Sequence, residues 1–412
     1  MNAEELWHPV YLSDQLVGRL VQRGDNTRFA FVDGYWETAD RRSLGLWFEQ
    51  NRGDGKASAV KLPPWFSNLL PEGPLREWIA KDRGVKTERE LELLLRIGGD
   101  LPGAVVVKEG ERRQGEDILE GRNRDEDDLK FSSVKKFSLA GVGMKLSMAQ
   151  KGGRFVLPVK DELGGWILKF PDPEYARIPA NEDAMMTLAG MCGIEVPEHH
   201  LVHRDEIDAS LASLWKSSED VAYVVRRFDR GGSGRRIHIE DFAQVRGIPS
   251  GSLEKYQGSF ETVGALCYRD YDLEALRQWA RRIAFNLAIG NGDAHLKNWS
   301  LIYRDGRHPT LSPAYDLVST AIHMRDENLG LKFNGTREFG RVRSGGFARL
   351  EKKLGADGAD LESLAEETVN AVLGNLEAMR DRHPGVVSEL DWIEKNAAAI
   401  RRQLFLTSLG SK

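Results

Sequence analysis

Two carboxylates and an amide in the C-terminal half of the chain have the residue types and the spacing that phosphoryl transfer requires. Asp293 and Asn298 stand five residues apart, and Asp316 follows downstream. Kinases use an aspartate to accept the proton of the substrate hydroxyl, an asparagine five residues later as a metal ligand, and a later aspartate to join the metal to the phosphates. A plain polar turn has a similar composition. The spacing combined with the second carboxylate favours the catalytic interpretation.

A helix and a loop are predicted to carry Asp293. Apolar residues recur at helical spacing between positions 276 and 288, and the string Gly290-Asn291-Gly292 that follows is a helix breaker. The helix therefore delivers Asp293 onto a loop. His295, two residues further on, either holds Asp293 in place through a hydrogen bond or is an ordinary packed histidine.

A hairpin is predicted to bring Asp316 back to the same place. Residues 299–303 alternate as a strand does, Asp305-Gly306 is a turn, and residues 310 and 311 belong to the return strand. The end of this hairpin places Asp316 beside Asn298. The three candidate groups thus converge through short-range structure alone.

A phosphate cradle is expected on the N-terminal side of these residues. The stretch from Ser138 to Ser147 reads Ser-Leu-Ala-Gly-Val-Gly-Met-Lys-Leu-Ser and places Gly141 and Gly143 ahead of Lys145. Without a Cβ, the N–H groups of such glycines can approach phosphate oxygens closely. The string differs from that of P-loop enzymes, and a hairpin turn has the same composition.

A lysine on a buried strand is a further candidate phosphate ligand. Residues 165–171 predict a short apolar strand that carries one cation, Lys169, and stops at a proline. Such a lysine commonly reaches the surface along its own stem, but the kinase lysine likewise sits on a strand after the glycine loop. The following segment predicts a helix with Asn181 as its N-cap. Glu182 either pairs with Lys169 or favours the helix dipole.

The segment from 221 to 236 combines a β-branched strand with a cluster of arginines. Residues 221–229 predict a strand that ends at the glycine-rich string 231–234, where a two-lobed kinase would have its hinge. Main-chain groups of residues 225–228 could then meet adenine, although a core strand has the same composition. Such a run of arginines is either solvated surface or a site for substrate or nucleic acid. The arginines are Arg226, Arg227, Arg230, Arg235 and Arg236.

Length and composition predict several subdomains. A chain of 412 residues exceeds one ordinary core, and we divide it into residues 1–125, 126–228 and 229–412. The polar stretch 108–130 is the best linker, and helical periods over 361–376 and 390–404 make the last part mostly α. The irregular segment 247–259 is interpreted as a surface loop, either part of a substrate or nucleotide gate or a variable insertion.

Charge and cysteine usage narrow the class of protein. The net charge of −5 argues against a large DNA-binding face. No apolar run reaches membrane-spanning length, and the acidic N-terminus lacks the pattern of a signal peptide. Cys192 and Cys267 form no metal-ligand spacing. A cytoplasmic location is the simplest expectation.

The motifs together resemble those of HipA-type serine/threonine kinases, the toxin half of bacterial HipA–HipB toxin–antitoxin pairs. The shared strings occur in family order over roughly residues 8 to 409. They are Leu69-Leu-Pro-Glu-Gly73, Gly99-Asp-Leu-Pro-Gly-Ala104, Ser138-Leu-Ala-Gly141, Ile167-Leu-Lys-Phe-Pro171, Asn181-Glu182, Arg227-Phe-Asp-Arg230, Ile239-Glu-Asp-Phe242, Gly292-Asp-Ala-His-Leu-Lys-Asn298 and Pro313-Ala-Tyr-Asp316.

This resemblance implies a fold and a set of site residues. The fold is α+β and two-lobed like that of protein kinases, with a mixed α/β N-terminal lobe, an extra N-terminal subdomain and a mostly helical C-terminal lobe. Asp293, assisted by His295, would be catalytic, and Asn298 and Asp316 would hold Mg²⁺. Ser138 matches the autophosphorylated serine of the family. The residues implied to bind ATP are Ser138, Ala140, Gly141, Val142, Gly143, Lys145, Lys169, Arg226, Arg227, Phe228, His295, Lys297, Asn298 and Asp316.

Two positions depart from the family pattern. Gly143 stands where the family often has Gln, which should make the glycine loop more mobile. Arg226 replaces a common Glu at the hinge, so main-chain recognition of adenine is what carries over. Neither change removes an essential catalytic group.

The resemblance also implies partners and a biological role. It predicts an ATP- and Mg²⁺-dependent toxin kinase that pairs with a HipB-like helix-turn-helix antitoxin, contacts operator DNA mainly through that antitoxin, and phosphorylates a translation-related protein such as an aminoacyl-tRNA synthetase. Two alternatives stay open. One is a small-molecule phosphotransferase, and the other is a pseudokinase that acts by binding the antitoxin.

Overall fold

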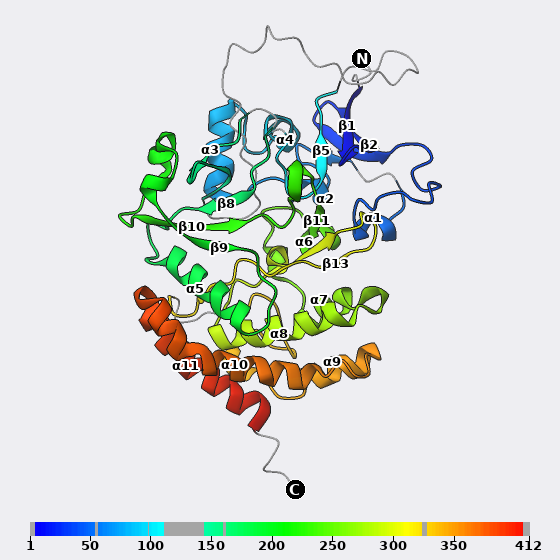
Figure 1. Ribbon diagram of the computed structural model, residues 1–412. Helices are drawn as coiled ribbons and strands as arrows, with labels where there is room; N and C mark the ends of the chain where they lie inside the picture. Colours follow the sequence, from blue (N-terminus) through cyan, green and yellow to red (C-terminus); the bar gives the residue numbers. More distant parts are fainter. Residues whose placement is uncertain are drawn as a thin grey trace.

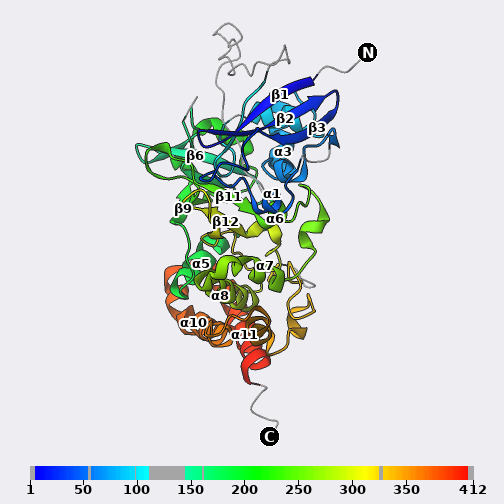
Figure 2. The same cartoon turned by 90° about the vertical axis from the view of Figure 1, so that its right-hand side faces the viewer.

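Two β-rich layers occupy one end of the molecule and a helical lobe occupies the other (Figure 1). This computed structural model describes residues 5–53, 57–97, 99–110, 144–159, 162–323 and 328–406. Turning the molecule by 90° keeps the same order, with the N-terminal strands at one end and the last helices at the other (Figure 2). Among the described residues, no helix combines the length and the apolar character that a membrane crossing needs.

An antiparallel sheet begins the chain, with the spatial order β4-β3-β2-β1-β5. Buried residues alternate with half-buried ones along the end of β1, as expected for a sheet with one covered face. The strands are β1 (Glu5–Leu12), β2 (Gln15–Arg23), β3 (Asn26–Phe31), β4 (Ser58–Ala59) and β5 (Val105–Val107). The helices of this part are α1 (Leu46–Gln50), α2 (Pro64–Ser67), α3 (Gly73–Arg83) and α4 (Glu90–Ile97).

A second antiparallel sheet, with the order β7-β6-β8-β10-β9, carries the candidate phosphate-binding lysines. Lys169 of β8 lies opposite Lys145 of β6 on one side and Tyr223 of β10 on the other. The predicted strands around Lys169 and from 221 onward are both confirmed. The elements are β6 (Lys145–Lys151), β7 (Arg154–Val156), β8 (Trp166–Lys169), α5 (Ile178–Met191), β9 (His199–His203) and β10 (Val221–Arg226).

One apolar core joins these first two sheets. Leu20 and Phe66 of the N-terminal part are buried in the same cluster as Met148, Leu168 and Val224 of the second sheet. Burial of each such side chain contributes about 1.5–3 kcal/mol relative to an exposed one. The covered faces of the two sheets are therefore packed as a unit.

The third sheet and the remaining helices form the other lobe. The short sheet has the order β11-β12-β13, and its β12–β13 pairing confirms the predicted hairpin. The helical periods also appear where they were predicted. The elements are β11 (His238–Asp241), α6 (Phe242–Val245), α7 (Phe260–Cys267), α8 (Leu273–Ile289), β12 (Ser300–Tyr303), β13 (Thr310–Leu311), α9 (Gly346–Leu354), α10 (Leu361–Arg382) and α11 (Val387–Arg401).

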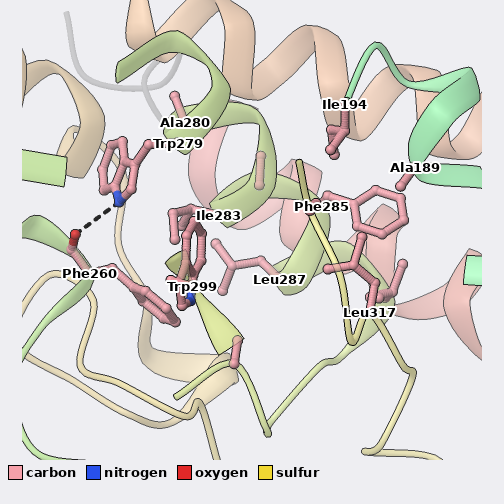
Figure 3. Close-up of a cluster of buried hydrophobic side chains, with 14 of the residues drawn as sticks. Ala189, Ile194, Phe260, Trp279, Ala280, Ile283, Phe285, Leu287, Trp299 and Leu317 are labelled. Atoms are coloured by element: carbon pink, nitrogen blue, oxygen red, sulfur yellow. Dashed lines mark hydrogen bonds between the residues drawn. The ribbon is translucent and has the colours of Figure 1, made fainter. Parts of the chain in front are cut away.

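Helix α8 is the centre of this lobe, because almost its whole second half is buried. Figure 3 shows Trp279, Ile283 and Leu287 along α8, with the Trp279 indole N–H donating to the carbonyl of Phe260 at 2.9 Å. Replacing a buried tryptophan of this kind by alanine costs about 3–5 kcal/mol. The helix is thus a rigid base for the loop that follows it.

Candidate active site

The loop that carries Asp293 is fixed by the end of α8. Gly290 caps the helix in the left-handed conformation (φ 68°), and a Cβ there would lie 2.4 Å from the ring of Trp392. The side-chain oxygen of Asn291 then accepts a hydrogen bond from the Asp293 N–H at 3.0 Å. As predicted, the helix ends at the breaker and Asp293 stands on a loop, where its side chain is 52% exposed.

A tyrosine that the sequence did not indicate lies against the Asp293 carboxylate. The Tyr256 hydroxyl donates a hydrogen bond to Asp293 Oδ1 at 3.0 Å. The Nδ2 of Asn298 donates to the main-chain oxygen of Asp293 at 2.7 Å, so its side-chain carbonyl oxygen is left for another partner. The predicted spacing of five residues therefore does bring Asp293 and Asn298 together.

The ring of His295 packs beside the Asp293 carboxylate without a hydrogen bond to it, although the His295 N–H donates to the Asp293 carbonyl at 2.7 Å. Its Nε2 lies 3.7 Å from Asp293 Oδ1, beyond hydrogen-bond range. Its ring meets that of Tyr256 edge-on, with the centroids 4.9 Å apart. Burial lowers the pKa of His295, which keeps the imidazole neutral. Of the two interpretations of this residue, the geometry matches the packed histidine.

Two lysines and two carboxylates form a buried charge centre in the cleft. Lys169 Nζ donates to Glu182 Oε1 at 2.5 Å and also to Asp316 Oδ1, while Lys145 Nζ lies 4.0 Å from Asp316 Oδ2. Burial alone would lower the pKa of Lys169, but the two carboxylates raise it well above its usual range. Burial likewise opposes the ionised form of Asp316, yet the two lysines hold its pKa far below normal. Lys169 pairs with Glu182, as one of the two alternatives predicted.

The backbone that presents Asp316 is supported by α5. Asp316 has a left-handed conformation (φ 54°), which is uncommon outside glycine and is found at functional sites. The prediction that Asn181 caps this helix is wrong, because α5 begins at Ile178 with Pro179 in its first turn. Asn181 instead exchanges two side-chain hydrogen bonds of 3.0 Å with the main chain of Ser319. Its amide therefore ties the Asp316 segment to the helix.

The predicted hinge residues line the cleft, but their side chains have other partners. Arg226 forms an exposed ion pair with Glu198 at 3.4 Å. The N–H groups of Arg226 and Arg227 donate to main-chain carbonyls of Glu198 and Gly165. The ring of Phe228 packs on Tyr315 at a centroid distance of 5.6 Å.

The arginine cluster is only partly a surface feature. Arg227 and Arg230 are buried, and both form ion pairs of 2.8–3.0 Å with Asp100 and Asp229. Burial would raise the pKa of Asp229, but the two guanidinium groups keep it well below its usual range. The interpretation of the whole cluster as solvated surface is therefore wrong for these two residues. Asp229 is their near neighbour in the chain, whereas Asp100 lies 127 residues from Arg227 and could not be read from the spacing.

A glutamate of the N-terminal part neutralises two lysines of the cleft wall. Glu72 Oε1 accepts from Lys297 Nζ at 2.7 Å and from Ser250 Oγ at 2.9 Å, while Oε2 accepts from Lys255 Nζ at 3.1 Å. The side chain of Glu72 is only 5% exposed. Burial opposes its ionised form, but the two ammonium groups hold its pKa far below normal.

The same contacts place the irregular segment 247–259 at the site. Lys255 lines the cleft, and the next residue, Tyr256, donates its hydroxyl to Asp293. The segment therefore borders the site, and its role as a gate stays a prediction. Glu72 lies in the string Leu69-Leu-Pro-Glu-Gly73, one of the motifs identified in the sequence. Nothing in that string identifies Lys255 and Lys297 as the partners of Glu72.

These groups surround one open cleft, whose empty space of about 950 Å³ includes the solvent at its mouth. The second sheet contributes Lys145 and Lys169, and the other lobe contributes Lys297, Asn298 and Asp316. The predicted cradle residues Ser138, Ala140, Gly141, Val142 and Gly143 lie outside the described residues.

Comparison with known proteins shows the family to which this chain belongs. The HipA N-terminal domain matches residues 8–108, and the HipA-like C-terminal domain matches residues 137–376. The Sinorhizobium fredii protein Y4dM is 37% identical over 388 residues, which cover 91% of this chain and 92% of that protein. The serine/threonine-protein kinase toxin HipA of Shewanella oneidensis is 28% identical, with 78% of this chain and 77% of that protein covered.

A solved structure has the same fold. The protein of the Shewanella oneidensis complex of HipA, HipB and operator DNA matches with a TM-score of 0.72 at 21% identity, and the match covers 96% of this chain and 97% of that chain. The expected α+β, two-lobed, kinase-like fold is confirmed. The chain belongs to the family of HipA-type kinases.

Proposed function

We propose that this protein is an ATP- and Mg²⁺-dependent serine/threonine protein kinase. The observation that carries the proposal is the convergence of Lys169, Asn298 and Asp316 on one cleft, with Asp293 hydrogen-bonded to Asn298 at its edge. These residues come from β8, the loop after α8 and the segment after β13, so their meeting is a property of the fold. Each has the residue type that phosphoryl transfer requires.

The side chains have distinct roles in this proposal. Asp293 is half exposed and takes the proton of the acceptor hydroxyl. Lys169 keeps its charge between Glu182 and Asp316 and directs it at the nucleotide phosphates. The amide oxygen of Asn298 and the carboxylate of Asp316 are hard oxygen ligands of the kind that suits Mg²⁺. A bound Mg²⁺ would offset the charge on the phosphates.

The biological role follows from the family. We infer that the protein is the toxin of a toxin–antitoxin pair, that a HipB-like antitoxin binds it, and that operator DNA is contacted mainly through the antitoxin. The name of the Shewanella oneidensis relative and the composition of the solved complex support this inference. The acceptor would be a translation-related protein such as an aminoacyl-tRNA synthetase. Phosphorylation of its own Ser138 would place a dianion in the glycine loop and compete with ATP for the same N–H groups.

Intact mass after incubation with ATP and Mg²⁺ tests the activity. Phosphatase-treated wild type should gain one phosphate, whereas Asp293→Asn and Ser138→Ala should gain none. Asp205→Asn is the matched control, because that side chain is 85% exposed, and it should behave as wild type. Phosphate on the Asp293→Asn protein would remove Asp293 from the role of catalytic base.

Two further outcomes separate the alternatives. Phosphate that appears on a metabolite and never on protein would identify a small-molecule phosphotransferase, and ATP binding without turnover would identify a pseudokinase. Growth arrest by wild type but not by Asp293→Asn would connect toxicity to phosphorylation. Equal arrest by both proteins would contradict that connection.

A further inference from the structure

A second groove lies on the other face of β11 from the catalytic cleft. Ile239 and Asp241 line the cleft, whereas His238 lines the groove, because successive side chains of a strand point to opposite faces. The groove holds about 1,240 Å³ of empty space, open solvent included, and is formed by residues of the β1–β2 turn, Arg42, residues 234–238 at and before the start of β11, and the β12–β13 turn. None of its lining residues belongs to the kinase site described above.

Hydrogen bonds between distant segments hold the groove in shape. The Ser43 N–H donates to the Gly306 carbonyl at 2.9 Å, which joins the N-terminal part to the β12–β13 turn. Nε2 of the His238 ring forms a hydrogen bond of 2.9 Å with the Leu44 carbonyl. Burial lowers the pKa of His238 to about 4, so the ring is neutral and Nε2 is the donor. The walls are therefore fixed before any ligand arrives.

Guanidinium groups dominate the groove. Four arginines from three separate parts of the chain line it, against two carboxylates, Asp14 and Asp305. Asp305 is turned toward its own loop, where its Oδ1 accepts the N–H groups of the next residues at 2.8 Å. The arginines are Arg42, Arg235, Arg236 and Arg304.

Two of these arginines have no carboxylate partner within the described part of the chain. Arg235 is exposed, and no acidic group pairs with it there. Arg236 donates to the Gly99 carbonyl, but its buried Nη1 has no protein acceptor among the described residues. Burial and the neighbouring Arg230 lower the pKa of Arg236 to about 10, so it still carries its charge at neutral pH. A buried donor of a charged group that has no acceptor is costly unless an anion or a polar ligand meets it.

We propose that this groove is a second ligand site, separate from the kinase cleft, and that it binds a chain of phosphoryl groups through Arg42, Arg235, Arg236 and Arg304. Planar guanidinium forks match phosphate oxygens and donate two hydrogen bonds at once. A peptide would also need apolar pockets or a pairing strand, whereas the side chains of Leu12 and Tyr303 in this groove are buried in the core. The same chemistry is offered by a free polyphosphate and by the backbone of a nucleic acid.

Binding of inorganic tripolyphosphate to the full-length protein tests the proposal. The double variant Arg235→Ala/Arg304→Ala removes two cations that lie at the surface, and Arg343→Ala removes an exposed arginine outside the groove. We expect the double variant to bind tripolyphosphate at least about tenfold more weakly than wild type. The slope of log affinity against log salt concentration should also be shallower, by about one unit for each lost contact. Arg343→Ala should bind as wild type, and circular dichroism should show that all three proteins are folded.

Three outcomes locate the ligand or overturn the proposal. Equal binding by wild type and the double variant, with loss in Lys169→Ala, would place the phosphates in the kinase cleft and refute the groove. Equally tight binding of hexaglutamate would refute specificity for phosphoryl groups. A single-stranded oligonucleotide that competes for the same arginines would identify a nucleic-acid backbone as the source, and its failure to compete would identify a free polyphosphate.

Chemical modification provides a measurement without substitutions. Phenylglyoxal reacts with accessible arginines, and tripolyphosphate should protect Arg235 and Arg304 but leave Arg343 reactive. Unchanged labelling of all three residues at saturating tripolyphosphate would contradict the proposal.

Discussion

Replacement of Glu72 by glutamine should destabilise the protein far more than the loss of an ordinary surface charge. The carboxylate is the shared partner of Lys255 and Lys297, and the three side chains are 5%, 8% and 4% exposed. Glutamine keeps the shape but leaves two buried ammonium groups without a counter-charge. Removal of one partner from a buried ion pair costs about 3–5 kcal/mol. Solvent hardly reaches these groups, so screening by water and salt reduces this cost little.

Urea unfolding at neutral pH measures this effect, with Glu338→Gln as the matched control. Glu338 pairs with Arg341 at 2.8 Å, but both side chains are more than half exposed, so its loss should cost at most about 1 kcal/mol. In the Glu72→Gln background, Lys255→Met should recover part of the lost stability, because it removes one of the unpaired charges. Equal stability of the Glu72→Gln and Glu338→Gln proteins would refute the reasoning.

The pH dependence gives a second check on Glu72. Its pKa in the folded protein is below the ordinary value of 4.5, so its stabilising contribution is complete above pH 4.5 and is lost as the pH falls toward the folded pKa. The difference in stability between wild type and Glu72→Gln should therefore be constant near neutrality and narrow in acid. A difference that grows below pH 4.5 would contradict the assignment.

Two other substitutions test the site and its supports. Tyr256→Phe removes the hydroxyl that donates to Asp293, so a substrate hydroxyl no longer has to displace it. Steady-state phosphorylation should therefore show a lower KM with little change in kcat. A large fall in kcat would instead make Tyr256 a positioning residue. Glu240 accepts hydrogen bonds from Leu46, Trp65 and Tyr303, but burial raises its pKa to about 7 from 4.5. The fold therefore favours its neutral form, and about 3 kcal/mol of stability present below pH 4.5 should be lost as the pH rises through 7. Thermal unfolding across this range should show no such loss for Glu240→Gln, and parallel curves for the two proteins would exclude Glu240 as the titrating group.

The sequence by itself determined the parts of the site that depend on neighbours in the chain. The apolar period of α8, the Gly290 breaker and the hairpin turn at Gly306 act over short distances, so they fixed the loop of Asp293 and the return toward Asp316. The strand that carries Lys169 was predictable for the same reason.

Only the tertiary structure decided which distant groups meet. Glu72 reaches Lys255 and Lys297 across 183 and 225 residues, and no spacing rule connects positions so far apart. Asn181 has the residue type of a helix cap, yet its partner is Ser319, 138 residues away. Local patterns record the preferences of single elements, whereas buried ion pairs and amide contacts depend on how the packed sheets and helices bring those elements together.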